Sequence, residues 1–421
     1  MDHHHFSIEV MARLLAGDLS HEELVNEVAA HLWQLCPHCR EQHEEILRLQ
    51  KKFGHWDERV AVLEGREAPQ SYERLKDLSF DEQLSLVADD ASLQTWAFCQ
   101  FLLQESMDAV FEDAAKAINL AELAVRVALQ LGEAYDPHWV LDLRAKAYAY
   151  LGNAQKVLGE LRSAETAFRE SEGYLARSLS GNTLILAEVL HLKASLRHDQ
   201  RRFEEALALV DQALLIYRES DEAHGLGIVL LKKAKILEES GDLEAAIRLL
   251  RGAIEEIDSV QEGRLHLYAR YNLILCLTLA GYFQEAGRLL PEIRESLSEE
   301  GRPLDSVRLR WTEGKIAFGL GRTGEAEEAF RSVQQEFLSR GMGYDAALVS
   351  LNLAVLFAQE RRTGELKKLA AELMRVFEAR DVHREAVAAL IMFQKACEEE
   401  RLTAQLAEKI AAMLKEARRP R

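Results

Sequence analysis

A histidine and a pair of cysteines near the start of the chain carry its clearest chemical signal. Cys36 and Cys39 form a C-x-x-C motif, and His31 lies about one helical turn before it. Two thiolates at this spacing can bind one tetrahedral metal ion, and an imidazole adds a third ligand. The histidine run at residues 3–5 offers a fourth ligand if the segment between folds back. The pattern predicts a structural Zn²⁺ site.

Three other interpretations of the C-x-x-C motif compete with structural zinc. A redox motif is expected beside a βαβ pattern, which does not surround these cysteines. Two cysteines without a ligand are the second alternative. Catalytic zinc needs a carboxylate placed as a general base, as in H-E-x-x-H, and none is nearby. We prefer the structural metal, because three short helices cannot build a stable core alone.

Short amphipathic segments must position these ligands. Apolar residues recur at helical spacing between Phe6 and Leu15, and Gly17 ends that run. Ser20 and Glu23 have the spacing of a capping box, which predicts the start of the helix that leads to the C-x-x-C motif.

The segment LLAGDLSHEELVNEVAAHLWQLCPHCRE resembles the zinc-binding anti-sigma domain, and the resemblance covers about the first 55 residues. That family has an N-terminal Cys or His, a short helix, a small turn, and a helix that ends in H-L-x-x-C-x-x-C. The resemblance implies these zinc ligands: His31, Cys36, Cys39, and His4 or His5. This chain has four residues between the histidine and the first cysteine where the family has three. His38 and His43 are therefore alternative ligands.

The character of the sequence changes after this segment. Gly54, Gly65 and Pro69 lie among charged residues and are typical of a loop or hinge. We expect residues 1–60 to form the zinc-binding head, 61–78 to form a linker, and 79–421 to form a second region. A helical pattern starts that region at Ser79.

One pattern recurs about every 40 residues through the second region. In its clearest copy, YLGNAQKVLGELRSAETAF, Gly152 stands where two helices would cross, Gly159 at the turn, and Ala164 in the second helix. Small residues are needed where paired helices approach closely. The position of Ala164 recurs, after a first step of 42 residues, in steps of 40: Ala206, Ala246, Ala286, Ala326, Leu366 and Leu406.

This spacing resembles the tetratricopeptide family over about residues 90–418. The resemblance implies an all-α fold, a right-handed α-solenoid of helix–turn–helix repeats. The family repeat is 34 residues, so the helices here should be longer. In the family the first helix of each pair lines the inner groove, which places these residues toward a protein or peptide partner: His191, Tyr268, Tyr271, Arg308, Trp311 and Lys315. Aromatic and arginine side chains are good anchors, although each of these residues can instead pack between neighbouring repeats.

Composition excludes several classes of protein. The net charge of −18 argues against a nucleic-acid surface. No apolar run reaches the ~18 residues that a membrane span needs, and no signal peptide is evident. Five sparse cysteines predict a reducing compartment without a disulfide framework, so we expect a cytoplasmic protein. The chain has neither a phosphate-binding G-x-x-x-x-G-K-[ST] loop nor a G-x-S-x-G elbow, which favours a non-enzyme.

The sequence therefore favours a non-catalytic protein–protein interaction scaffold with a regulatory role. The head would bind a sigma factor or similar regulator, as its resemblance implies, and the groove would bind a protein or peptide. The alternative is an adaptor or accessory subunit of a larger bacterial defence, signalling or protease-type complex. A zinc-dependent enzyme is the third hypothesis.

Overall fold

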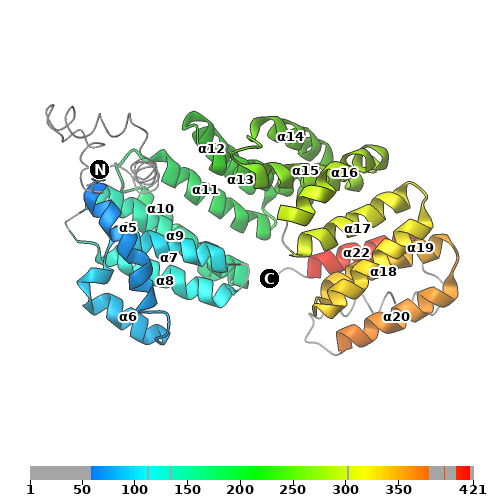
Figure 1. The fold of residues 1–421 in the computed structure, drawn as a ribbon, viewed down its shortest axis with the longest axis horizontal. Coiled ribbons are helices and arrows are strands. Elements are labelled where there is room, and N and C mark those ends of the chain that lie inside the picture. Colours follow the sequence, from blue (N-terminus) through cyan, green and yellow to red (C-terminus); the bar gives the residue numbers. More distant parts are fainter. Residues whose placement is uncertain are drawn as a thin grey trace, which may run out of the picture. The chain divides into compact units, whose positions relative to one another are not determined.

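The computed structural model describes residues 58–110, 113–132, 135–300, 303–378, 393 and 404–417. Every element within these ranges is helical. The chain divides into two compact units between Leu196 and Arg197. Figure 1 labels the helices along the chain.

The first unit is built of helices that pack in sequence order, with α7 against α8, α8 against α9, and α9 against α10. Its elements are α5 (Glu58–Glu73), α6 (Phe80–Asp89), the 3-10 helix η2 (Ala91–Leu93), α7 (Trp96–Ala109), α8 (Ala114–Gln130), α9 (Pro137–Leu158), α10 (Leu161–Leu175) and most of α11 (Thr183–Asp199). Ser79 and Glu82 form a capping box at the start of α6, where the sequence predicts that a helical segment begins.

The second unit continues the helix pairs. Its elements are α12 (Phe203–Glu219), α13 (Ala223–Ser240), α14 (Leu243–Glu256), α15 (Gly263–Leu279), α16 (Phe283–Glu300), α17 (Pro303–Gly319), α18 (Thr323–Ser339), α19 (Gly343–Gln359), α20 (Thr363–Glu378) and α22 (Ala404–Ala417). We call α13, α15, α17 and α19 the A helices and α12, α14, α16, α18 and α20 the B helices. Each A helix also contacts the next A helix.

The recurring small residue of the sequence pattern lies at the centre of the packing. Five helices from α10 to α18 carry it, and each of these alanines is 0% exposed: Ala164, Ala206, Ala246, Ala286 and Ala326. The repeat assignment from the sequence is therefore confirmed for these helices. Because an alanine here lets the partner helix approach closely, a larger side chain would separate the pair.

The turn between the A and the B helix needs a left-handed backbone at one position. Gly241, Gly281 and Gly321 hold it with φ of 96°, 85° and 76°. Arg201 and Arg361 hold the same place in their repeats with φ of 60° and 58°. Glycine adopts this conformation without steric penalty, whereas an arginine is strained there.

Two helix crossings depend on the absence of a side chain. A Cβ atom on Gly152 would lie 2.9 Å from Phe168 Cε2, and one on Gly314 would lie 2.7 Å from Phe330 Cε1. Both rings are buried. At both crossings an aromatic ring of the paired helix therefore fills the space beside the glycine.

Helix α5 occupies most of residues 61–78, where a loop or hinge is expected around Gly65 and Pro69. This helix packs against α7. Glu64 on α5 accepts a hydrogen bond of 2.6 Å from the Tyr135 hydroxyl, and that hydroxyl accepts one from the Trp96 amide. Burial raises the pKa of Glu64. Gly65 and Pro69 are compatible with a helix here, because its apolar side gains a core to pack against.

Within the described part of the chain, no helix is both long enough and apolar enough to span a membrane.

Candidate functional site

Five of the six predicted partner-binding residues lie on two neighbouring A helices. Tyr268 and Tyr271 belong to α15, and Arg308, Trp311 and Lys315 belong to α17. We call these five residues the A-helix surface. His191, the sixth, lies on α11 in the first unit and is only 8% exposed.

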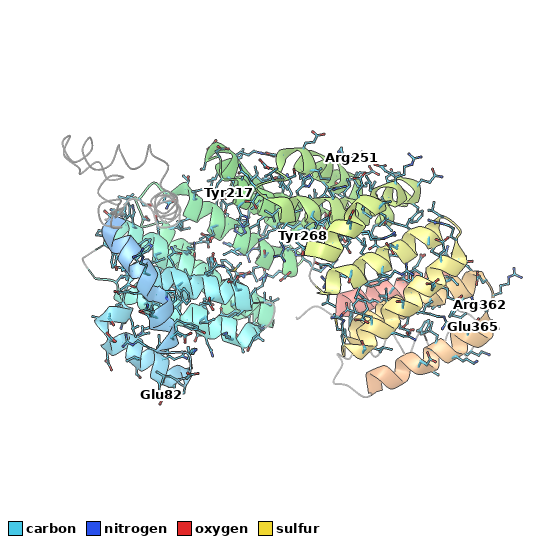
Figure 2. All side chains as sticks on the ribbon, viewed as in Figure 1. Glu82, Tyr217, Arg251, Tyr268, Arg362 and Glu365 are labelled. Carbon is cyan, nitrogen blue, oxygen red and sulfur yellow. The ribbon has the colours of Figure 1, made fainter. Side chains whose placement is uncertain are left out.

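A carboxylate fixes one side of the A-helix surface. The Tyr268 hydroxyl donates a hydrogen bond of 2.8 Å to Asp305 on α17, so this ring lies where α15 meets α17 (Figure 2). Arg308 lies 3.8 Å from the same carboxylate, and its side chain is 52% exposed. The Arg264 guanidinium stands 5.8 Å from the centre of the Tyr268 ring. Two guanidinium groups thus gather around one buried acid and one aromatic ring.

The indole of Trp311 is held on three sides. Its Nε1–H donates a hydrogen bond of 2.7 Å to Asn352 Oδ1 on α19. Its ring meets Phe337 edge to face at 6.0 Å, and Lys315 Nζ lies 4.2 Å from its centre. An ammonium group at that distance from an aromatic face makes a favourable cation–π contact. The indole therefore has one fixed orientation and joins α17 to α19.

Tyr271 has a different environment from its neighbour Tyr268. Burial raises its pKa, while a hydrogen bond with Thr312 on α17 acts in the opposite direction. It packs against the apolar cluster around α14–α16. This tyrosine joins two A helices rather than offering its hydroxyl to a ligand.

The A-helix surface is suited to binding and orienting a partner. Guanidinium and ammonium groups bind carboxylates and carbonyls, and the flat rings offer apolar area with little rotational freedom. Arg264, which the sequence pattern did not single out, belongs to this arrangement. Its spacing of four residues before Tyr268 on the same helix was the available signal.

His198, at the end of α11, is enclosed by two carboxylates. Its side chain is 16% exposed, with Nδ1 3.3 Å from Asp199 and Nε2 3.2 Å from Glu239 on α13. Burial opposes the charged form, but the hydrogen bonds with the two carboxylates hold its pKa above the ordinary value. We interpret it as a contact that joins the end of α11 to α13.

A groove along α16 and α17 has no counterpart among the predicted sites. It consists of two adjoining depressions of about 200 Å³ and about 410 Å³. Both are lined by Arg294, Arg310 and Glu313. We call this feature the α16–α17 groove.

The predicted zinc ligands lie outside the described residues: His4, His5, His31, Cys36 and Cys39. Within the described ranges, no three or more His, Cys, Asp or Glu side chains are grouped to hold a metal ion. The zinc site remains a prediction from the sequence.

The helix pairs define a helical-repeat fold, and comparison with known proteins gives its type. Residues 185–255, from α11 to α14, match the family model for the tetratricopeptide repeat. The repeat fold of this chain is of that type. No curated protein sequence matches it.

Two solved structures share the fold over most of the chain. The apo form of RapI aligns with a TM-score of 0.54 and 15% identity, over 85% of this chain and 98% of that one. Aspartyl phosphate phosphatase F from Bacillus subtilis aligns with a TM-score of 0.53 and 15% identity, over 91% of this chain and 96% of that one. At this identity the likeness concerns the fold alone.

Proposed function

We propose that this protein is a non-catalytic scaffold for protein–protein interaction with a regulatory role. The A-helix surface binds a segment of a protein or peptide partner. The observation that carries this proposal is the exposed guanidinium of Arg308 beside aromatic rings that the protein itself holds in place.

The fixed rings favour binding because little order has to be imposed when a partner arrives. Tyr268 is held by Asp305 and Trp311 by Asn352. Immobilising a rotamer-rich side chain at an interface costs about 0.5–1.5 kcal/mol, and these rings are already immobile. The partner therefore meets a preformed platform.

The charges indicate which groups of the partner bind. Asp305 is 8% exposed and lies beneath Arg308, which is half exposed. A partner carboxylate or carbonyl can bind the outer side of that guanidinium without displacing the buried acid. An apolar side chain next to it would lie against the aromatic platform.

The head, residues 1–60, is part of the same proposal. A donor set of two thiolates and one or two imidazoles suits structural zinc, with His31, Cys36 and Cys39 and one of His4 or His5 as ligands. Bound zinc would hold the head folded. The resemblance of this segment to the anti-sigma domain supports a sigma factor or similar regulator as its partner.

The test is capture of partners by the full-length chain from its native host, followed by their identification. Arg308→Glu reverses the charge of the A-helix surface. The matched control is Arg340→Glu, because Arg340, at the end of α18, is also an exposed arginine that pairs with a carboxylate of its own helix, Glu336. We expect Arg308→Glu to lose one specific partner that Arg340→Glu retains.

The identity of the captured proteins separates the hypotheses. A sigma factor or another regulator supports the regulatory scaffold, whereas a co-purifying enzyme complex supports the adaptor alternative. Identical capture by wild type and Arg308→Glu would contradict a role for the A-helix surface.

A further inference from the structure

Arg264 and Arg308 are exposed arginines that lie beside the same tyrosine from two neighbouring A helices. Arg264 belongs to α15, and its guanidinium lies 5.8 Å from the centre of the Tyr268 ring. Arg308 belongs to α17 and lies 3.8 Å from Asp305, the acid that accepts the hydrogen bond of Tyr268. One guanidinium therefore adjoins the ring of the tyrosine, and the other adjoins the carboxylate that holds its hydroxyl.

The N–H donors of these two arginines have no acceptor within the part of the chain that the structure describes. The 3.8 Å between Arg308 and Asp305 is longer than a hydrogen bond. Arg264 contacts only the tyrosine ring. By contrast, the guanidinium of Arg218 donates bonds of 2.7 Å and 2.9 Å to Glu256. Because a guanidinium carries five N–H donors, the two arginines can bind oxygen atoms of a partner without breaking a bond inside the protein.

The repeat architecture does not require an arginine at either position. Forty residues after the two arginines stand Leu304, which packs against an apolar cluster, and Leu348, which is 6% exposed. Forty residues before the first of them stands His224, which lies 2.9 Å from Glu262. Neighbouring repeats thus use these positions for an apolar contact or for a matched charge. Packing between repeats does not explain the two arginines.

We propose that Arg264 and Arg308 bind a pair of acidic side chains in a partner segment, one carboxylate on each guanidinium, and this rests on the binding role proposed above for the A-helix surface. The partner is then of an acidic class, and Arg264 is a second residue that determines specificity. Hydrogen bonds between arginine and carboxylate are charge-assisted and can be bidentate. The fixed ring of Tyr268 between the two groups offers a surface for the apolar part of the bound segment.

The local balance of charge favours an acidic segment, although the whole chain carries a net charge of −18. Two guanidinium groups adjoin one carboxylate, that of Asp305, which is only 8% exposed. Exposed charges farther away than about 8 Å are largely screened at physiological ionic strength. A carboxylate that reaches this place therefore responds mainly to the two arginines.

The probes are three labelled peptides of one length that share the same apolar residues. Their central pair is Glu-Glu, Gln-Gln or phosphoserine-Ala, and each has an amidated C-terminus so that only side chains supply negative charge. Binding to the full-length chain is measured by fluorescence anisotropy. We expect the Glu-Glu peptide to bind at least about tenfold more tightly than the Gln-Gln peptide, because hydrogen bonds to charged groups are the stronger ones.

The variants remove one charge at a time from exposed positions. Arg264→Gln and Arg308→Gln should each lower the affinity for the Glu-Glu peptide by about tenfold and leave the affinity for the Gln-Gln peptide unchanged. Arg248→Gln is the matched control, since Arg248 on α14 is also exposed and forms no ion pair within the described ranges. It should change the affinity for neither peptide. Circular dichroism verifies that all three variants keep their helices.

The acid-pair assignment is overturned if neither peptide binds, if the Glu-Glu and Gln-Gln peptides bind wild type equally, or if Arg264→Gln keeps the preference for Glu-Glu. Binding of the phosphoserine peptide at least about tenfold more tightly than the Glu-Glu peptide would also overturn it, because the partner would then be phosphorylated. If Arg308→Glu loses its partner in the capture experiment while Arg264→Gln keeps the preference for Glu-Glu, the scaffold function stands and only the acid-pair assignment fails.

Discussion

Replacement of Gly314 by alanine tests how the helix pairs are packed. The added Cβ would lie 2.7 Å from Phe330 Cε1 and 3.1 Å from Ala329 Cβ. The Phe330 ring is 1% exposed and can move only by displacing its neighbours. Overpacking of this kind costs about 1–3 kcal/mol. Alanine also favours a helix over glycine by about 1 kcal/mol, which partly offsets that cost.

A control variant separates the two effects. Gly252→Ala adds the same methyl group to a helix where nothing lies within 4 Å, so it reports the helix preference alone. We expect Gly252→Ala to raise the free energy of unfolding by about 1 kcal/mol. Gly314→Ala should fall below that control by about 1–3 kcal/mol in urea unfolding followed by circular dichroism.

A compensating substitution completes the test. In the pair α13 and α14, the equivalent positions are Ala234 and Leu250, both in one core cluster. Phe330→Leu should therefore cost less stability in the Gly314→Ala chain than in wild type, with a coupling of about 0.5–3 kcal/mol. Equal stability of Gly314→Ala and Gly252→Ala, or strictly additive effects of the two substitutions, would refute the reasoning.

Three further predictions concern a charge, a turn and the head. His198→Asn should destabilise the chain more at pH 6 than at pH 9, by up to about 1 kcal/mol in thermal unfolding. Because the pKa of His198 is raised in the folded state, its contribution to stability is fully present below the ordinary pKa of 6.5 and is lost as the pH rises through the folded-state pKa. An equal loss of stability at pH 6 and pH 9 would contradict this. Arg361→Gly should stabilise the chain by up to about 1 kcal/mol in urea, because it relieves a left-handed arginine, and no gain would show that the backbone is unstrained. Metal analysis should find one zinc per chain in wild type and none in Cys36→Ser, whereas zinc retained by that variant would exclude Cys36 as a ligand.

The repeat architecture could be predicted because its signal is steric and periodic. The pairs from α9–α10 to α17–α18 carry a small residue at the same point, and Ala206, Ala246, Ala286 and Ala326 are all fully buried. The turns carry an equally strict requirement, which Gly241 and Gly281 meet with a positive φ. Each of these constraints acts on a single position of the repeat, so it can be recognised in one sequence without an alignment.

The loop or hinge expected around Gly65 and Pro69 shows where this reasoning fails. Gly65 and Pro69 favour a break, yet α5 runs from Glu58 to Glu73. The deciding contact joins Glu64 to Tyr135, which is 71 residues away in the chain. Local propensity is a weak guide when tertiary packing of this kind is available.

The candidate sites divide in the same way. The positions of Tyr268, Arg308 and Trp311 on neighbouring A helices follow from the repeat register. The repeat register does not show that Asp305 and Asn352 are their hydrogen-bond partners, because a hydrogen bond between repeats depends on side-chain geometry. The α16–α17 groove is a gap left by absent side chains, and only comparison of Gly287 with Ile247 in register could have revealed it.

The size matching at the helix crossings has a consequence for how such a chain can change in length. Gly152 faces Phe168 and Gly314 faces Phe330, whereas Ala354 and Ala370 occupy these places in α19 and α20 and Ile274 and Leu290 occupy them in α15 and α16. The two residues that meet at a crossing belong to the same helix pair, so each pair carries both contacting surfaces. Duplication or deletion of a whole pair keeps these crossings intact, whereas replacing α9 or α17 by a helix with Ala or Ile at the crossing places a side chain against the ring of Phe168 or Phe330. The pair is therefore the unit in which this array can grow, shrink or be recombined.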